Sequence, residues 1–171
     1  MAFARPEPTE AAEYYFRYID QVPDGDIREL LVKQRDEALA FFASIPDERT
    51  RTPYAPGKWT LRQVLAHLND TERLFAFRAM WFARGMEAPL PSFEQDIAVA
   101  NNPADHRSWQ SHLDEFRTIR DSTIDLFRHL PDEAWSRQGT ASDYPFSVRA
   151  LAYIIVGHVA HHIAGAKANY L

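Results

Sequence analysis

The chain has 171 residues, a formal net charge of −5 and no cysteine. This length fits one domain, and a mildly acidic chain without a basic block is a poor candidate for non-specific binding to nucleic acid or to an anionic membrane surface. The lack of cysteine excludes disulfides, thiolate nucleophiles and cysteine-ligated metals, so any metal site must use His, Asp or Glu side chains.

No segment is typical of export or of a membrane span. The N-terminal residues lack the apolar stretch of a signal peptide. The uncharged run from Ala150 to Ala166 contains three histidines and is shorter than the roughly 20 apolar residues that cross a bilayer. We therefore expect a cytoplasmic protein without a membrane partner, in which this run is a buried helix.

A short helix is predicted near the N-terminus. Residues 9–21 have aromatic residues at helical spacing, namely Tyr14, Tyr15 and Tyr18, and Val22–Gly25 (VPDG) breaks the pattern. We therefore divide the chain into an N-terminal arm with a short helix, residues 1–25, and a main domain, residues 26–171.

Four longer helices are predicted in the main domain. The first begins at Asp26 and ends at Pro46, and the second begins at Thr60, which has Gln63 at capping-box spacing, and ends near residue 84. The third covers residues 106–130, and the fourth begins at Ser147 and ends near residue 169. All four carry apolar residues at helical spacing.

The connection at residues 85–105 is long for a compact domain and contains three prolines. No stretch alternates apolar and polar residues over enough positions to predict a strand, and no repeat of 20–50 residues is present. The predicted fold class is therefore all-α: a four-helix bundle with residues 85–105 as its long crossover and a short extra N-terminal helix.

Three histidines are candidate metal ligands. Residues four apart on a helix differ by about 40° in direction, so His158 and His162 lie one turn apart on the apolar stripe of the last helix, whereas His161 points about 100° away from His162. His67 lies on the inward side of the second long helix. Three inward histidines can hold one ion and leave a position for water or substrate. The alternative for each is a hydrogen-bonded core histidine.

Other metal and catalytic motifs fail. Val159 stands where a zinc-protease motif needs its glutamate, and no histidine has Glu three residues before it, as di-iron bundles require. The remaining histidines are interpreted as structural or neutral: His106 at a helix start, His112 on a solvated face and His129 at a helix end, where its charged form suits the helix dipole.

Acidic residues near the candidate ligands have two interpretations. Asp70 and Glu72 follow His67 closely, and either can hold an imidazole by its second nitrogen or lie on a solvated helix face. Glu94 and Asp96 lie in the crossover and are candidate catalytic residues, since either can act as a general base at the mouth of the bundle.

These segments resemble the DinB/YfiT-like superfamily. The matching segments are Gly57–Glu72 (GKWTLRQVLAHLNDTE), Pro89–Asp96 (PLPSFEQD) and Pro145–Lys167 (PFSVRALAYIIVGHVAHHIAGAK). The family pattern has Trp-Ser/Thr at the start of the second bundle helix, an inward histidine with an acidic residue soon after it, and a late His-x-x-His-His cluster. The resemblance covers about residues 26–171.

The resemblance implies a four-helix bundle, often dimeric, with a divalent metal held by His67, His158 and His162. His161 corresponds to the family's adjacent histidine, which is not usually a ligand. Zinc or nickel is the expected ion, and iron or manganese is the alternative. The family's Arg-Gly-Gln after this cluster is missing here, with Ala166 in the place of Gln, so polar substrate contacts from that turn should differ.

The family also implies a function with a small-molecule substrate. Members of the family that this chain resembles are, where their chemistry is known, mostly thiol-dependent S-transferases and isomerases that use bacillithiol or mycothiol, and many others are called metal-dependent hydrolases. The first hypothesis is an S-transferase that takes its sulfur from a low-molecular-weight thiol, because the chain has no cysteine. The second is a hydrolase that uses metal-bound water, and the third is a non-catalytic metal-containing binding or stress-response protein. Cationic pocket residues favour the first, a carboxylate near the ion the second, and a closed site the third.

A homodimer is also expected. The aromatic residues of the N-terminal helix and the apolar residues of the crossover exceed what one side of a bundle can bury, and exposed apolar surface usually marks a protein–protein contact. Two-fold dimers are the commonest soluble oligomers. The alternative is a monomer whose N-terminal helix folds back over its own bundle. The residues concerned are Tyr14, Tyr15, Phe16, Tyr18, Leu90, Phe93, Ile97 and Val99.

Overall fold

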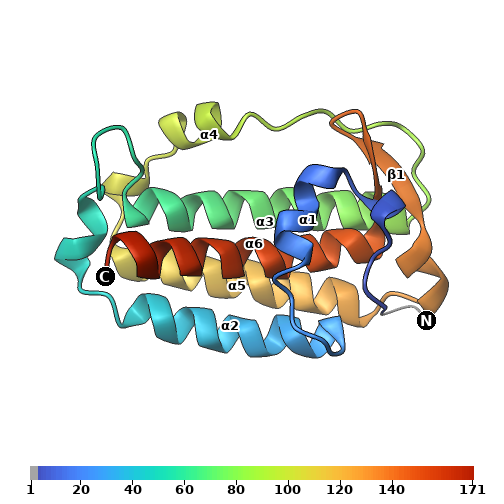
Figure 1. The fold of residues 1–171 in the computed structure, drawn as a ribbon, viewed down its shortest axis with the longest axis horizontal. Coiled ribbons are helices and arrows are strands. Elements are labelled where there is room, and N and C mark those ends of the chain that lie inside the picture. Colours follow the sequence, from blue (N-terminus) through green and yellow to red (C-terminus); the bar gives the residue numbers. More distant parts are fainter. Residues whose placement is uncertain (1–3) are drawn as a thin grey trace.

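The computed structural model describes residues 4–171 and contains the expected bundle. Its four long helices are α2 (Ile27–Ala43), α3 (Leu61–Ala83), α5 (Trp109–Arg128) and α6 (Val148–Asn169). Helices α2 and α3 each pack against both α5 and α6, so α2 and α3 occupy opposite corners of the bundle. The all-α prediction is confirmed, and Figure 1 shows α3 and α5 running in one direction and α2 and α6 in the other.

The long crossover follows from this arrangement. Because α3 and α5 run in the same direction, the chain between them must return along the length of the bundle, as Figure 1 shows. The returning segment contains the short helix α4 (Gln95–Asn101), which packs on α3, and a 3-10 turn, Ala104–His106. Val99 is buried in this contact, whereas Ile97 is 64% exposed.

Side-chain caps fix where the helices begin. The Thr60 hydroxyl accepts a hydrogen bond from the Gln63 amide, and the Gln63 side chain accepts one from the Thr60 amide, which is the predicted capping box. The side chains of Asp26 and Ser147 cap α2 and α6 by accepting hydrogen bonds from the Arg28 and Ala150 amides. Each cap contributes about 1 kcal/mol. Helix α5 is capped by Ser108 and begins later than predicted, since the turn at Ala104–His106 is separate from it.

The prediction that the chain has no strand is wrong. Strands β1 (Gln138–Ala141) and β2 (Tyr144–Ser147) form an antiparallel hairpin at one end of the bundle. Each strand has four residues, too few for a recognisable alternation. The turn residues Ser142 and Asp143 have φ of 52° and 65°, which a two-residue hairpin turn requires and which short polar residues tolerate.

The N-terminal segment also differs from its prediction. In place of one helix over residues 9–21 it contains two 3-10 turns, Pro8–Glu10 and Glu13–Tyr15, and the single-turn helix α1 (Phe16–Ile19). The buried Glu10 carboxylate pairs with Arg149 of α6, at 2.5 Å, and this contact ties the segment to the bundle. Further contacts of the segment with α6 are made by α1.

The aromatic residues of this segment are better covered than the sequence indicated. Tyr18 is buried, Tyr15 and Phe16 are half-buried, and Tyr14 is 51% exposed. A Cβ atom at Gly157 would lie 2.0 Å from the Tyr18 carbonyl oxygen, so only glycine allows this close approach of the two backbones. The segment thus covers its own bundle, and the homodimer stays a prediction.

A polar layer crosses the middle of the bundle between two apolar clusters. One cluster contains Leu31, Phe75, Ile124 and Val156, and the other contains Ala38, Leu68, Phe116 and Val159. The buried or half-buried polar residues between these positions, one or more from each long helix, are Gln34, Thr71, Glu72, Arg120 and His158. None of the helices in the described part of the chain is long and apolar enough to cross a membrane.

Candidate metal centre

Three histidines from two helices converge beside this polar layer. The Nε2 atom of His158 lies 3.2 Å from Nε2 of His67 and 3.0 Å from Nε2 of His162. One nitrogen from each of the three rings lies within 4.8 Å of the other two. Among residues 4–171 this is the one group of three or more His, Asp or Glu side chains with such spacing. The residues predicted as ligands are therefore brought together.

The spacing of these nitrogens suits one ion. Zinc binds imidazole nitrogen at about 2.1 Å, so two such nitrogens lie about 3.0 Å apart at a right angle and about 3.4 Å apart at the tetrahedral angle. The two short separations fall near or within this interval. Three neutral imidazoles as donors suit zinc, nickel or iron.

Thr71 orients His158. The Thr71 hydroxyl lies 2.7 Å from the carbonyl oxygen of His67, one turn earlier in α3, and donates its proton there. It can then accept the Nδ1–H of His158, 3.3 Å away, which leaves Nε2 of His158 as a free lone pair. A metal-binding histidine usually has its second nitrogen held in this way.

His67 is held by ring packing. Its Nδ1 atom is buried and has no hydrogen-bond partner among the described residues. The ring contacts Trp59, with centroids 5.0 Å apart, and both other histidines of the cluster. Tyr18 of α1 packs edge-on against His158 at 5.1 Å, so the N-terminal segment forms part of the wall around the cluster.

Burial keeps these histidines neutral. Loss of solvent lowers the pKa of His67 to about 4, although the charge of Asp96 opposes the shift. Burial and then the neighbouring His67 and His161 lower the pKa of His162 to about 3. The pKa of His158 is also far below its ordinary value, chiefly because of burial. At neutral pH all three therefore present the unprotonated form that binds metal.

The acidic residues considered near the cluster lie elsewhere. Glu72 is buried and forms two hydrogen bonds with Arg120, of 2.7 and 2.8 Å, and Asp70 accepts a hydrogen bond from Asn102 at 3.0 Å. Neither holds an imidazole; Thr71, which lies between them, does. Asp96 is exposed but close enough to His67 to influence its charge, whereas Glu94 is exposed at the N-terminus of α4.

Of the remaining histidines, His161 and His129 follow their predictions, whereas His106 and His112 do not. His106 is exposed at the end of the 3-10 turn Ala104–His106 and not at the start of α5, which begins at Trp109. His161 is exposed, packs edge-on against Tyr18 and His162, and does not belong to the group of converging nitrogens. His129 is exposed at the end of α5, as expected. His112 is fully buried rather than solvated, because the crossover folds over it and Nε2 bonds the Ala104 carbonyl at 2.9 Å.

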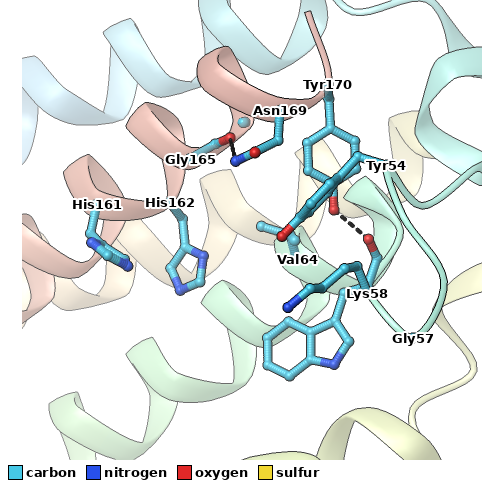
Figure 2. A pocket seen from close by; sticks show the side chains of 11 residues that line it. Tyr54, Gly57, Lys58, Val64, His161, His162, Gly165, Asn169 and Tyr170 are labelled. Carbon is cyan, nitrogen blue, oxygen red and sulfur yellow. Dashed lines mark hydrogen bonds between the residues drawn. The ribbon is translucent and has the colours of Figure 1, made fainter.

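Two cavities adjoin the histidine cluster. The wider one has a volume of about 490 Å³, and Figure 2 shows His161 and His162 on one side of it and Tyr54, Lys58 and Tyr170 on the other. The Tyr170 hydroxyl donates a hydrogen bond to the Trp59 carbonyl and so ties the end of α6 to the loop before α3. This loop supplies Lys58, for which the described residues contain no ion-pair partner.

The narrower cavity has a volume of about 200 Å³ and reaches the other side of the cluster. His67, His158 and Thr71 contribute to its wall, and Arg78 and tyrosines of the N-terminal segment complete it. No Asp or Glu from residues 4–171 lines either cavity. The sequence analysis assigned no role to Thr71, Lys58 or Arg78. The available signal was helical register, since Thr71 and Arg78 fall on the His67 face of α3.

Comparisons with known proteins agree with this architecture. The DinB superfamily model matches residues 30–165. YfiT from Bacillus subtilis, described as a probable metal-dependent hydrolase with an unusual four-helix bundle topology, superposes with a TM-score of 0.74 at 19% identity, over 96% of this chain and 90% of that one. No curated protein sequence matches.

A second similar structure is a mycothiol-dependent maleylpyruvate isomerase, with a TM-score of 0.69 at 12% identity. The match covers 85% of this chain but 61% of the isomerase, so the isomerase has a large part without a counterpart here. Both likenesses concern the fold alone at these identities. With a family match over most of its length and the family's bundle, the chain belongs to the DinB superfamily.

Proposed function

We propose that the protein is a metal-dependent S-transferase in which His67, His158 and His162 hold a divalent ion. One observation carries this proposal: the histidine cluster lies between two cavities, each containing a cationic side chain and neither lined by a carboxylate from the described residues. A transferase must bring two substrates together, whereas a hydrolase needs one substrate and a base for its water.

The ion would supply one element of the chemistry. Zinc or nickel, with iron or manganese as alternatives, favours the thiolate form of a bound thiol at neutral pH. In the transfer a carbon–sulfur bond forms, the thiol proton passes to solvent, and the leaving group departs with the electron pair of the bond that breaks. The chain itself contains no cysteine, so the sulfur comes from a low-molecular-weight thiol.

The wider cavity suits that thiol. Its volume of about 490 Å³ lies within the range of small-molecule sites, and it opens beside His162. Low-molecular-weight thiols of the bacillithiol type carry carboxylates, which Lys58 can attract. Trp59, Tyr54 and Tyr170 offer aromatic faces for the rest of the molecule, and the amide of Asn169 offers hydrogen bonds.

Asp96 supports a second candidate function. Its charge acts on His67, so a carboxylate lies near the cluster although it lines neither cavity. If Asp96 accepts a proton from water, the protein is a hydrolase. Glu94 has no comparable interaction, and its catalytic role stays a prediction.

Two assays on metal-loaded protein separate the candidates. Protein loaded with zinc, nickel, iron or manganese is incubated with bacillithiol, mycothiol or another small thiol and a panel of electrophiles, and thiol consumption is measured beside hydrolysis of the same electrophiles without thiol. We expect thiol-dependent product that His67→Ala abolishes and Asp96→Asn leaves in place. Hydrolysis without thiol that Asp96→Asn abolishes would replace the transferase by the hydrolase. Bound metal without either activity would favour a non-catalytic binding protein.

A further inference from the structure

Arg78 is a buried arginine without a carboxylate partner. Its side chain is 1% exposed, and Nη2 donates hydrogen bonds to the Pro91 carbonyl at 2.8 Å and to the Ser142 hydroxyl at 3.1 Å. Nε is buried and has no hydrogen-bond partner among the described residues. No Asp or Glu of residues 4–171 forms an ion pair with it.

The group that interacts electrostatically with this guanidinium does not neutralise it. That group is Tyr15, whose hydroxyl also interacts with Arg78 by side-chain hydrogen bonding, and burial raises the pKa of this hydroxyl even though Arg78 acts in the opposite direction. Tyr15 is therefore uncharged at neutral pH. A guanidinium keeps its proton in proteins, and a buried charge without a counter-charge is costly. The described residues therefore supply no anion that neutralises Arg78.

Arg78 lies in the wall of the narrower cavity beside the histidine cluster. Arg78 lines the same cavity of about 200 Å³ as His67 and His158. It follows His67 by eleven residues in α3, which places the two side chains within about 20° of each other around the helix and their Cα atoms about 16 Å apart along it. The cavity thus runs along one face of α3 from the histidines to the arginine.

The rest of the cavity wall indicates a small organic anion. Leu74, Phe75 and Phe93 provide apolar surface, and hydroxyl and amide groups provide hydrogen bonds. The volume is below the 300 Å³ or more that is typical of drug-sized ligands. A planar guanidinium matches a carboxylate particularly well. The polar groups are those of Tyr14, Tyr15, Tyr18, Gln95 and Ser142.

We propose that Arg78 binds the carboxylate of a small organic acid in this cavity and thereby places the acid's reactive carbon near the three histidines. This inference deepens the proposed transferase function and rests on it for the ligand's role: the acid is the electrophile, and the thiol occupies the wider cavity. Arg78 and Lys58 then sort the two substrates to opposite sides of the cluster.

Binding is tested without reference to turnover. Zinc-loaded protein is titrated with butyrate, with its neutral isostere butyramide and with inorganic phosphate, and dissociation constants are taken from NMR chemical shifts. We expect butyrate to bind, butyramide and phosphate to bind much more weakly, and Arg78→Gln to weaken butyrate about 30-fold or more, since one member of a buried charge pair is removed. Lys58→Gln is the matched control in the other cavity and should leave butyrate binding unchanged.

Stability distinguishes a binding arginine from a structural one. In the absence of ligand, Arg78→Gln removes an uncompensated buried charge, so its melting temperature should equal or exceed that of the parent, and butyrate should raise the melting temperature of the parent only. A lower melting temperature together with unchanged butyrate binding would overturn the proposal, as would tight binding of phosphate in place of butyrate. If the protein takes up no metal, the same titration is made on metal-free protein, and butyrate binding that Arg78→Gln abolishes there would refute the transferase and leave the anion site intact.

Discussion

The two sides of the polar layer are satisfied in different ways. On one side Arg120, fully buried, bonds both oxygens of Glu72 and also the side chain of Gln34, whose amide donates to the Val156 carbonyl. On the other side three imidazoles point their Nε2 atoms at one another, Nδ1 of His67 lacks a partner among the described residues, and farther along α3 so does Nε of Arg78.

This difference distinguishes polar groups that support the fold from polar groups that can bind a ligand. Burial of a polar group is costly unless its hydrogen bonds are made, so a closed network is compatible with a purely architectural role. Groups left with unmet bonding capacity indicate a ligand that completes them. The Glu72–Arg120 pair needs nothing further, whereas the histidines and Arg78 together can receive a cation and an anion.

Removal of one of the three converging histidines should have the largest effect, which is loss of the bound metal. His67→Ala, His158→Ala and His162→Ala are each expected to weaken metal binding by more than the 10–100-fold that loss of an outer partner causes, so that purified protein carries little metal. Metal per chain is measured by plasma mass spectrometry. His161→Ala is the neighbouring control and should keep its metal; the reverse result for His161 and His162 would refute the assignment.

Removal of Glu72 should lower the stability of the fold without affecting metal binding. Glu72→Ala leaves Arg120 buried and unpaired, and we expect the free energy of unfolding to fall by about 3–5 kcal/mol in urea titrations. Asp70→Asn, two residues away in a partly exposed contact, should change it by less than about 0.5 kcal/mol. Metal content should stay at the parent level in both variants. Metal loss in Glu72→Ala would show that Glu72 supports the metal centre after all.

Acid should destabilise the metal-free protein through the histidines. His67 has a pKa of about 4 in the folded state and about 6.5 when unfolded, so the unfolded state binds more protons between these values. Stability is therefore complete above pH 6.5 and falls as the pH decreases toward 4, by on the order of 3 kcal/mol for His67 alone. Urea titrations from pH 7 to 4.5 measure this loss before most carboxylates titrate. The free energy of unfolding should depend less on pH in His67→Phe, and an unchanged pH dependence would contradict the assignment.

Loss of the Thr71 hydroxyl should weaken metal binding less than loss of a histidine does. Thr71→Val keeps the shape of the side chain but leaves Nδ1–H of His158 without an acceptor, and we expect zinc to bind 10–100-fold more weakly. Competition with a chromophoric chelator gives the dissociation constant. Thr71→Ser retains the hydroxyl and should bind zinc as the parent does; equal affinity in Thr71→Val would show that His158 is oriented by packing alone.

Local rules were enough for the helices and for the histidine pair. Capping patterns at Thr60 and Ser147 mark helix starts because a cap is made within four consecutive residues. The stacking of His158 and His162 follows from the same local geometry, since helical register is fixed by 3.6 residues per turn. The inward position of His67 was readable from the apolar stripe around it.

Tertiary structure decided which group each polar side chain meets. Glu72 and Thr71 are neighbours on α3, but their side chains meet different helices. Because of the rotation of α3 against α5 and α6, Glu72 bonds Arg120 and Thr71 bonds His158. His112 is buried because the crossover folds over it. Arg78 is held beside the histidine cavity by hydrogen bonds to the Pro91 carbonyl of the crossover and to the Ser142 hydroxyl of the hairpin turn. Such partners lie far apart in the sequence. Helical periodicity shows which face of a helix points inward, but it does not show how that helix is rotated about its axis relative to its neighbours.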